Sequence, residues 1–361
     1  MKKIKAAIIG TGGISHLHTK GYLERPDVEL AALCDLDREK ALRYAEKYGV
    51  DPSHVYTDYN EMLAAEKLDC VSVCTWNAAH APATIAALNA GCHVLCEKPM
   101  AMNSAEARAM QEAADRNHRV LQIGFVRRFG ADAGVAREMI DAGAVGEIYY
   151  GKATYLRRHG FPGGWFGDKA YSGGGPLIDL GVHVIDLSRY LMGNPRPVSV
   201  YGATFHKLGN RPEVRQAADV WSSTTKESRF EFTVEDLATA MIRFDNGAIL
   251  SVECSFDLNI EKGSGDITLF GTKAGLQVSP EIALFTNQNG YMANVSLANK
   301  VTFDEAAFNR EVSHFVDCGI ACDAGKPFEC RSPGTDGIVI MQILESIYKS
   351  GETGHEVVIG E

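Results

Sequence analysis

Three features typical of membrane, nucleic-acid-binding or secreted proteins are missing from this sequence of 361 residues. No apolar stretch approaches the roughly 20 residues needed to span a bilayer, and no block of lysine or arginine occurs. The chain starts with Met1-Lys2-Lys3 and runs directly into a strand-like segment, without the apolar core of a signal peptide. We therefore expect a cytoplasmic protein that has no membrane partner.

The charge balance argues against nucleic acid as a partner. The chain carries 36 basic and 46 acidic side chains, a formal net charge of −10. A phosphate backbone attracts a basic face, so this composition excludes a general affinity for DNA or RNA.

The nine cysteines show no Cys-x-x-Cys spacing. Most of them, such as Cys34, Cys70, Cys74 and Cys96, lie in apolar runs, where a free thiol packs as a small hydrophobic group. We expect reduced thiols, with no disulfide and no metal site.

Residues 1–125 alternate short apolar segments with helical patterns. Strands are predicted over Ile4 to Ile9, Val28 to Cys34, Cys70 to Thr75, His93 to Cys96 and Val120 to Gly124. Helices are predicted over Ile14 to Arg25, Arg38 to Tyr48, Ala81 to Ala90 and Ser104 to Asn117. Strands separated by helices indicate an α/β fold with a doubly wound parallel sheet of the Rossmann type.

Residues 126–361 follow a different pattern. Longer strands are predicted over Glu147 to Arg157, Pro197 to Phe205, Asp236 to Phe244, Ala248 to Phe256 and Gly265 to Phe270. Asp245-Asn246-Gly247 indicates a hairpin, because Asn-Gly supplies the positive φ angles of a two-residue turn. We expect an α+β domain with a large, mostly antiparallel sheet. Four helices would cover its face or return to the first domain: Asp132 to Ala142, Leu177 to Leu191, Glu305 to Ala324 and Asp336 to Ser350.

A glycine-rich turn between the first strand and the first helix indicates a dinucleotide site. Gly10, Gly12 and Gly13, followed by Ile14 and Ser15, fit the pattern G-x-G-x-x-[small], in which the backbone approaches a pyrophosphate at a helix N-terminus. Asp35 ends the second strand, where a carboxylate holds the adenosine ribose hydroxyls.

Asp35 also bears on the choice of cofactor. A carboxylate there repels the 2′-phosphate of NADP and accepts hydrogen bonds from the free diol of NAD, so we predict NAD over NADP. Arg38 is close enough in sequence to bind a 2′-phosphate, which leaves NADP as the alternative.

Three further residues suggest a reaction. Lys98 lies in Glu97-Lys98-Pro99 directly after an apolar strand, and Asp179 and His183 have the i, i+4 spacing of one helix face. Oxidising a secondary alcohol needs a base for the hydroxyl proton and a positive group for the developing alkoxide. His183 is the natural base and Lys98 the positive group. The alternative assigns the proton to Lys98, and without context Asp179 and His183 also fit a capping acid and a structural histidine.

Five ordered motifs resemble the glucose-fructose oxidoreductase, inositol dehydrogenase and rhizopine catabolism family (Gfo/Idh/MocA). They are the Gly10 turn, Thr75-Trp76-Asn77 with His80, Ala90 to Pro99, Gly124-Phe125 with Arg127-Arg128-Phe129, and Gly173-Gly174-Gly175 through Asp179, Gly181, His183 and Asp186. The resemblance implies a Rossmann domain, an open-faced sheet that mediates a homo-oligomer (dimer, tetramer or hexamer), and NAD(P)-linked oxidation or reduction of sugars and cyclic polyols.

The resemblance also assigns roles to residues. It implies that Lys98, Asp179 and His183 are catalytic, and that Arg127 faces the substrate. The implied cofactor contacts are Gly10, Gly12, Gly13, Ile14, Asp35, Thr75, Trp76, Asn77, His80, Glu97 and Lys98. Trp76 replaces the proline that is usual in the family, and its indole either forms a bulkier wall against the cofactor or sugar or packs in the interior. Trp165 either offers an aromatic platform for a sugar or makes an ordinary apolar contact.

The sequence therefore predicts an NAD-dependent dehydrogenase that oxidises a ring hydroxyl of a sugar, a glycoside (at C3) or an inositol. Two alternatives remain: a glycoside hydrolase that uses bound NAD for transient oxidation, and a non-catalytic nucleotide-sensing regulator on the same scaffold.

Overall fold

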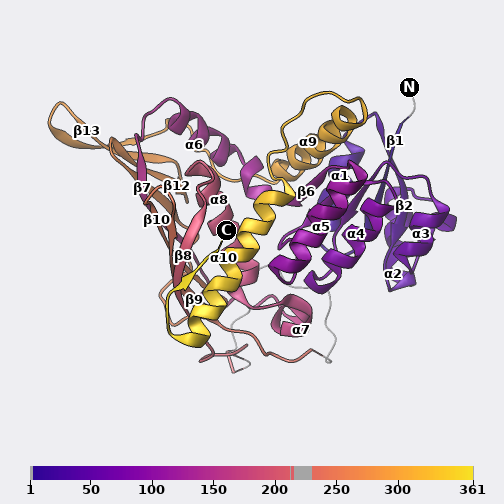
Figure 1. The fold of residues 1–361 in the computed structure, drawn as a ribbon, viewed down its shortest axis with the longest axis horizontal. Helices are drawn as coiled ribbons and strands as arrows, with labels where there is room; N and C mark the ends of the chain where they lie inside the picture. The colour runs from indigo at the N-terminus through magenta and orange to yellow at the C-terminus, as the bar shows by residue number, and fades with distance from the viewer. Residues whose placement is uncertain (1–2, 212, 215–229, 361) are drawn as a thin grey trace. The chain divides into compact units, whose positions relative to one another are not determined.

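The computed structural model describes residues 3–211, 213–214 and 230–360, which form two compact units (Figure 1). Unit 1 comprises Met1–Val126 and Glu305–Ile338, and unit 2 comprises Arg127–Asp304 and Val339–Glu361. The sequence predicted a domain boundary after residue 125, and the first segment of unit 1 ends one residue later, at Val126. Unit 1 additionally contains 305–338, which includes a helix that we expected either to cover the second sheet or to return to the first domain.

Unit 1 is built on a six-stranded sheet in the order β3-β2-β1-β4-β5-β6, and every neighbouring pair is parallel. Its strands are β1 (Ile4–Ile9), β2 (Val28–Cys34), β3 (Val55–Tyr56), β4 (Cys70–Val73), β5 (His93–Glu97) and β6 (Leu121–Gly124). Its helices are α1 (Ser15–Leu23), α2 (Arg38–Tyr48), α3 (Tyr59–Ala65), α4 (His80–Asn89), α5 (Ser104–Asn117) and α9 (Ala306–Asp323). The predicted doubly wound parallel sheet is confirmed.

Helix α9 completes the core of unit 1. It packs against α1 (Figure 1), where a Cβ on Gly21 would lie only 2.8 Å from the Cβ of Val312. Phe315 and Val316 of α9 join Tyr22 of α1 and Tyr44 of α2 in one buried cluster. Glycine at position 21 therefore lets two helices that are distant in sequence approach closely, and burial of their apolar sides stabilises the unit.

Unit 2 is built on a nine-stranded sheet in the order β14-β13-β12-β11-β7-β10-β9-β8-β15. Its strands are β7 (Ile148–Leu156), β8 (Pro197–Phe205), β9 (Leu237–Phe244), β10 (Ile249–Ser255), β11 (Ile267–Gly271), β12 (Ala274–Ser279), β13 (Ala283–Gln288), β14 (Tyr291–Ser296) and β15 (Val357–Val358). Only β7 and β10 pair in parallel. The sheet is thus mostly antiparallel, as predicted.

In the described part of the chain, helices lie on one face of this sheet and no helix covers the other face. Helices α6 (Ala131–Asp141) and α8 (Val182–Leu191) contact its strands, α7 (Lys169–Ser172) is a single turn, and α10 (Gly334–Thr353) enters unit 2 at residue 339. Along β9 the side chains of Ala240 and Ile242 are buried, whereas Met241 between them is 50% exposed. This alternation is typical of a sheet covered on one side.

Three details differ from the sequence prediction. The segment Leu177–Gly181 is a π-helix (η5) that continues into α8, so the single α-helix predicted over Leu177 to Leu191 is wrong in its first turn. The hairpin after β9 has a three-residue loop, because only Gly247, with φ of 84°, takes the positive angle. The short strands β3, β12, β13, β14 and β15 and helix α3 were not predicted. No helix in the described part of the chain is both long and apolar enough to cross a membrane.

Candidate active site

The glycine turn after β1 has the geometry of a nucleotide site. Gly10 has φ of 91°, and a Cβ there would lie 2.6 Å from the carbonyl oxygen of Cys74, so only glycine fits. A Cβ on Gly12 would meet nothing within 4 Å, which leaves the backbone open to a ligand. The Ser15 hydroxyl donates to the Gly12 carbonyl at 2.6 Å where α1 begins. The turn therefore suits a pyrophosphate held at a helix N-terminus.

Asp35 is fixed at the end of β2 by several donors. Its Oδ2 accepts from the backbone N–H and the hydroxyl of Thr11, both at 2.7 Å, and from Nζ of Lys40 at 2.8 Å. Its Oδ1 accepts from the N–H of Asp37 at 3.0 Å. Burial works to raise the pKa of Asp35, but Lys40 and these other donors hold it below its ordinary value. The carboxylate is ionised and oriented.

The cation that pairs with Asp35 lies two residues beyond Arg38, the arginine considered for a 2′-phosphate. Arg38 donates to the carbonyl oxygen of Val55 at 2.9 Å, whereas Lys40, which was not singled out, forms the ion pair with Asp35. Asp37 caps α2 through the N–H of Lys40, and this fixes the first turn from which Lys40 reaches back. Sequence spacing was the available signal. Arg38 and Lys40 lie three and five residues after Asp35, and spacing alone does not tell which of them reaches the carboxylate.

Lys98 directly follows β5 and differs in burial from its neighbours. Residues 92–97 and 99–101 are buried, whereas Lys98 is half-buried. The backbone N–H of Lys98 donates to Oε2 of Glu97 at 3.1 Å. Because Lys98 follows a buried strand and its N–H is hydrogen-bonded, its backbone is held in a defined position.

Glu97 is held in turn by His18, a residue that the sequence did not single out. Oε1 of Glu97 lies 2.9 Å from Nε2 of His18, and Nδ1 of His18 lies 3.1 Å from the hydroxyl of Ser72. Burial acts to raise the pKa of Glu97, but His18 and then Lys98 outweigh it, so the pKa falls below its ordinary value. The Glu97 carboxylate therefore links the backbone of Lys98 to the imidazole of His18 on α1.

His80 connects the ends of β4 and β5. Its Nδ1 lies 2.7 Å from the carbonyl oxygen of Pro99, and its Nε2 lies 3.2 Å from that of Thr75. Burial is the main cause that lowers the pKa of His80, and the two carbonyl oxygens, which can accept from the ring, act in the opposite direction. Asn77 is buried beside it, while Thr75 and Trp76 are half-buried.

In unit 2, Asp179 and His183 share a burial pattern. From 174 to 189 every residue is buried except these two, which are half-buried. The π-helical turn that contains Asp179 lies against β10, where a Cβ on Gly181 would be 3.2 Å from Sγ of Cys254. Single π-turns inside helices often occur at functional sites. The acid and the histidine are thus the two side chains that this segment presents.

The glycines before this helix are anchored by Glu235 and Tyr348, neither of which was predicted. Glu235 accepts from the N–H groups of Gly175 at 3.0 Å and Leu177 at 3.1 Å, and from the hydroxyl of Tyr348 at 2.9 Å. Burial raises the pKa of Glu235 despite these three donors. A Cβ on Gly174 would lie 1.9 Å from the Tyr348 hydroxyl oxygen, so glycine is required there.

Asp186, which follows His183 on α8, has a structural partner. Its carboxylate accepts from Nε of Arg128 at 3.0 Å and from Nη2 at 2.6 Å, and both side chains are buried. The guanidinium also lies over the Tyr190 ring, 4.9 Å from its centroid. The motif that contains Arg128 therefore meets the motif that contains Asp186 through a buried ion pair.

The two predicted substrate residues outside the helix also have neighbours. Arg127 donates to Oδ2 of Asp132 at 3.0 Å and lies over the Phe303 ring, 4.8 Å from its centroid. Trp165 lies in the short turn η4 (Gly164–Gly167) and stacks on Phe166 with a centroid distance of 3.9 Å. Both rings are half-buried, so an aromatic surface is present in this loop.

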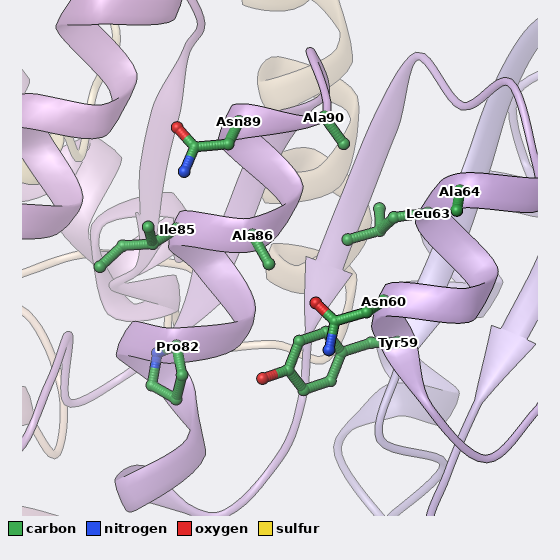
Figure 2. A pocket seen from close by; sticks show the side chains of 9 residues that line it. All are labelled: Tyr59, Asn60, Leu63, Ala64, Pro82, Ile85, Ala86, Asn89 and Ala90. Carbon is green, nitrogen blue, oxygen red and sulfur yellow. The ribbon is translucent and has the colours of Figure 1, made fainter.

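A groove between α3 and α4 in unit 1 has little chemistry to offer. Figure 2 shows its lining, with Tyr59 and Leu63 of α3 pointing toward α4, which contributes Pro82 and Ile85. The groove has a volume of about 570 Å³, and Tyr59 is its only titratable lining residue. None of the predicted site residues lines it.

The structure thus gathers the predicted cofactor residues at one edge of the first sheet. The parallel strands β1, β2, β4 and β5 all end there, and the residues that follow them are the Gly10 turn, Asp35, Thr75 and Lys98. Carboxyl ends of parallel strands are the usual ligand side of such a sheet. Lys98 belongs to unit 1, and Asp179 and His183 belong to unit 2.

Comparison with known families gives two matches along the chain. Residues 4–125 match a model described as the oxidoreductase family (GFO_IDH_MocA) with an NAD-binding Rossmann fold. Residues 135–277 match the GFO/IDH/MocA C-terminal domain.

Individual relatives agree with the family models. The chain is 38% identical over 357 residues to D-glucoside 3-dehydrogenase of Escherichia coli, covering 98% of this chain and 97% of that enzyme. It is 28% identical over 290 residues to levoglucosan dehydrogenase of Pseudarthrobacter phenanthrenivorans, covering 76% and 73%. A solved structure of a levoglucosan dehydrogenase with NADH matches with a TM-score of 0.84, 22% identity and full coverage of both chains, which establishes the fold.

Proposed function

Because the chain belongs to the Gfo/Idh/MocA family of NAD-binding oxidoreductases, we propose that it is an NAD-dependent dehydrogenase that oxidises a secondary ring hydroxyl of a sugar or glycoside to a ketone. The observation that carries the proposal is its similarity to a D-glucoside 3-dehydrogenase along nearly the whole chain. That relative makes the C3 hydroxyl of a glucoside the substrate position we propose.

The residues of unit 1 fit NAD, which when bound accepts the hydride. The open backbone at Gly12 and the N-terminus of α1 take the pyrophosphate, and Ile14 lies at that N-terminus. Asp35 accepts from the ribose diol, and its ionised state disfavours a 2′-phosphate, which supports NAD over NADP.

Lys98, His183 and Asp179 form the proposed catalytic set. As the C3–H bond breaks and hydride leaves the carbon, the hydroxyl O–H bond breaks and its proton goes to the imidazole of His183. The Lys98 ammonium stabilises the negative charge that develops on the oxygen. Asp179, on the same helix face, orients the imidazole and stabilises its positive charge once protonated.

Two other residues are proposed to shape the substrate site. The stacked Trp165 and Phe166 offer a flat apolar surface for the C–H face of a pyranose. Arg127 contributes hydrogen-bond donors more than net charge, because Asp132 already pairs with it.

A substrate panel tests the proposal. Purified protein with NAD and methyl D-glucosides, glucose, levoglucosan or an inositol should form NADH with glucosides, and product analysis should identify a 3-keto sugar. Lys98→Ala and His183→Ala should each lower kcat by at least about 100-fold, the usual effect of a positioned acid, base or charge. The exposed Lys47→Ala on α2 is the control and should retain activity.

The other outcomes discriminate between functions. If no member of the panel yields NADH, the dehydrogenase proposal is refuted. Glycoside cleavage without net NADH would replace it with hydrolysis through transient oxidation.

We also propose that the open face of the nine-stranded sheet joins copies of the chain into a homo-oligomer. Tyr201 on β8 and Met241 on β9 are register partners on this face and are 56% and 50% exposed. Apolar side chains gathered on an uncovered sheet favour such a contact.

A further inference from the structure

Three side chains with metal-binding atoms meet at α9, away from every residue assigned a role above. They are His314 and Cys318, one turn apart on the helix, and Cys330, on the segment that returns along α9 before α10. One donor atom from each, the imidazole nitrogen and the two sulfurs, all lie within 4.8 Å of one another. All three belong to unit 1, so the cluster is internal to one compact unit.

The local fold holds these groups in place. Sγ of Cys318 lies 3.8 Å from the carbonyl oxygen of Glu329, and Sγ of Cys330 lies 3.6 Å from Oε1 of Gln122 on β6. Cys318 is buried, whereas His314 and Cys330 are half-buried. The cluster thus has a fixed inner side and an outer side that water can reach.

The spacing fits a tetrahedral ion. Nε2 of His314 lies 3.5 Å from Sγ of Cys318. With Zn–N of about 2.05 Å, Zn–S of about 2.3 Å and an angle of about 109°, two ligands of one zinc ion lie about 3.6 Å apart. The observed distance between these two atoms therefore suits the binding of one zinc ion without a rearrangement of α9.

The imidazole nitrogen is also in the required state. The backbone N–H of Arg331 donates to Nε2 of His314 at 3.0 Å, so this nitrogen carries a lone pair and no proton. Arg331 is exposed, so water can take over its N–H when Nε2 binds a metal.

We propose that His314, Cys318 and Cys330 bind one Zn²⁺ ion, with water as the fourth ligand, in a site that ties α9 to the segment 326–333. Two thiolates and an imidazole are the soft donor set that zinc prefers over Mg²⁺ or Ca²⁺. The sequence expectation of no metal site rested on the missing Cys-x-x-Cys. His-x₃-Cys followed twelve residues later by cysteine has no such signature, so only the fold brings these ligands together.

Zinc titration of the full-length protein, prepared with reductant and chelator and then freed of both, tests the site. Zn²⁺ alone, in competition with a chromogenic chelator, should bind at one equivalent per chain. Cys318→Ser, Cys330→Ser and His314→Ala should each weaken binding by at least about 100-fold, the upper range for loss of an outer-shell partner alone. Cobalt substitution should give a thiolate-to-metal charge-transfer band in the unchanged protein that is lost or strongly weakened in these three variants.

Cys322→Ser is the matched control, because Cys322 lies one turn further along α9 and contacts the carbonyl oxygen of His118 instead. It should bind zinc as the unchanged protein does. Far-UV circular dichroism of each variant separates loss of a ligand from loss of fold, and the half-buried His314 supplies a variant that leaves both cysteines in place.

Two results would overturn the proposal. One is zinc binding that is absent from the unchanged protein or equal in all four variants. The other is a thiol count that falls by two on exposure to air, together with a Cys318–Cys330 cross-link that zinc does not prevent, which would identify a redox pair.

Discussion

The buried pair of Arg128 and Asp186 gives a quantitative test of how the second unit is held together. Asp186→Asn keeps the shape of the side chain but removes its charge. The carboxylate accepts two charged hydrogen bonds, at 3.0 Å and 2.6 Å, and the side chains are 0% and 1% exposed. Removing one partner of such a pair leaves a buried charge uncompensated and costs about 3–5 kcal/mol.

The loss should be visible in denaturation. For a unit of this size, about 3–5 kcal/mol corresponds to a fall in Tm of about 6–20 °C. Urea unfolding followed by tryptophan fluorescence gives the free energy of unfolding directly. Asp141→Asn is the control, because Asp141 pairs with Arg137 on the exposed side of α6, where solvent screens the pair and its loss should change stability far less.

A double variant separates the pair from its surroundings. The double variant Arg128→Met with Asp186→Leu removes both charges. Its loss of unfolding free energy should be well below the sum of the losses measured for Arg128→Met and for Asp186→Leu alone. If Asp186→Asn costs no more than Asp141→Asn, or if the double variant equals that sum, Arg128 and Asp186 do not act as a buried pair.

The remaining predictions concern the cofactor and assembly. Lys40→Ala should raise the ratio of kcat/KM for NAD to kcat/KM for NADP by about tenfold, or about 1.4 kcal/mol, because Lys40 offsets the charge on Asp35 that repels a 2′-phosphate. Arg38→Ala is the control and should leave this ratio unchanged. Since the pKa of Asp35 lies below its ordinary value, its carboxylate stays ionised and the dissociation constant of NAD should not change between neutral and mildly acidic pH; a constant that rises over this range would show that Asp35 is not the group that holds the ribose diol. Met241→Glu, on the open sheet face, should reduce the mass measured by light scattering without loss of circular dichroism signal; an unchanged mass would show that the copies do not meet through this face.

Local patterns were sufficient for most of the helices and strands. The apolar runs of β2 and β8, and the helices α2 and α5, were predicted with the same ends that the structure shows. These elements have strong periodicity and clear capping residues, such as Asp37 before α2 and Asn103 before α5. Of the strands that were missed, β13 lacks an alternation of buried and exposed residues, whereas β12 alternates over most of its length and could have been predicted.

Contacts between distant segments were not readable in the same way. Lys40 rather than Arg38 reaches Asp35 because of how α2 is set against β2. Glu235 and Tyr348 anchor Gly174 and Gly175 across 60 residues or more of sequence. No local pattern encodes such a pairing.

The sequence by itself determined the parallel sheet, the glycine turn with its aspartate, and the candidates Lys98, Asp179 and His183, because strand periodicity and turn chemistry act over a few neighbouring residues. Tertiary structure alone decided which groups hold those residues in place. Three such arrangements depend on the packing of elements far apart in the chain: the contact of Glu97 with His18, the ion pair of Asp186 with Arg128, and the cluster of His314, Cys318 and Cys330. The physical reason is that burial and hydrogen bonding between such elements exist only once the fold has brought them together.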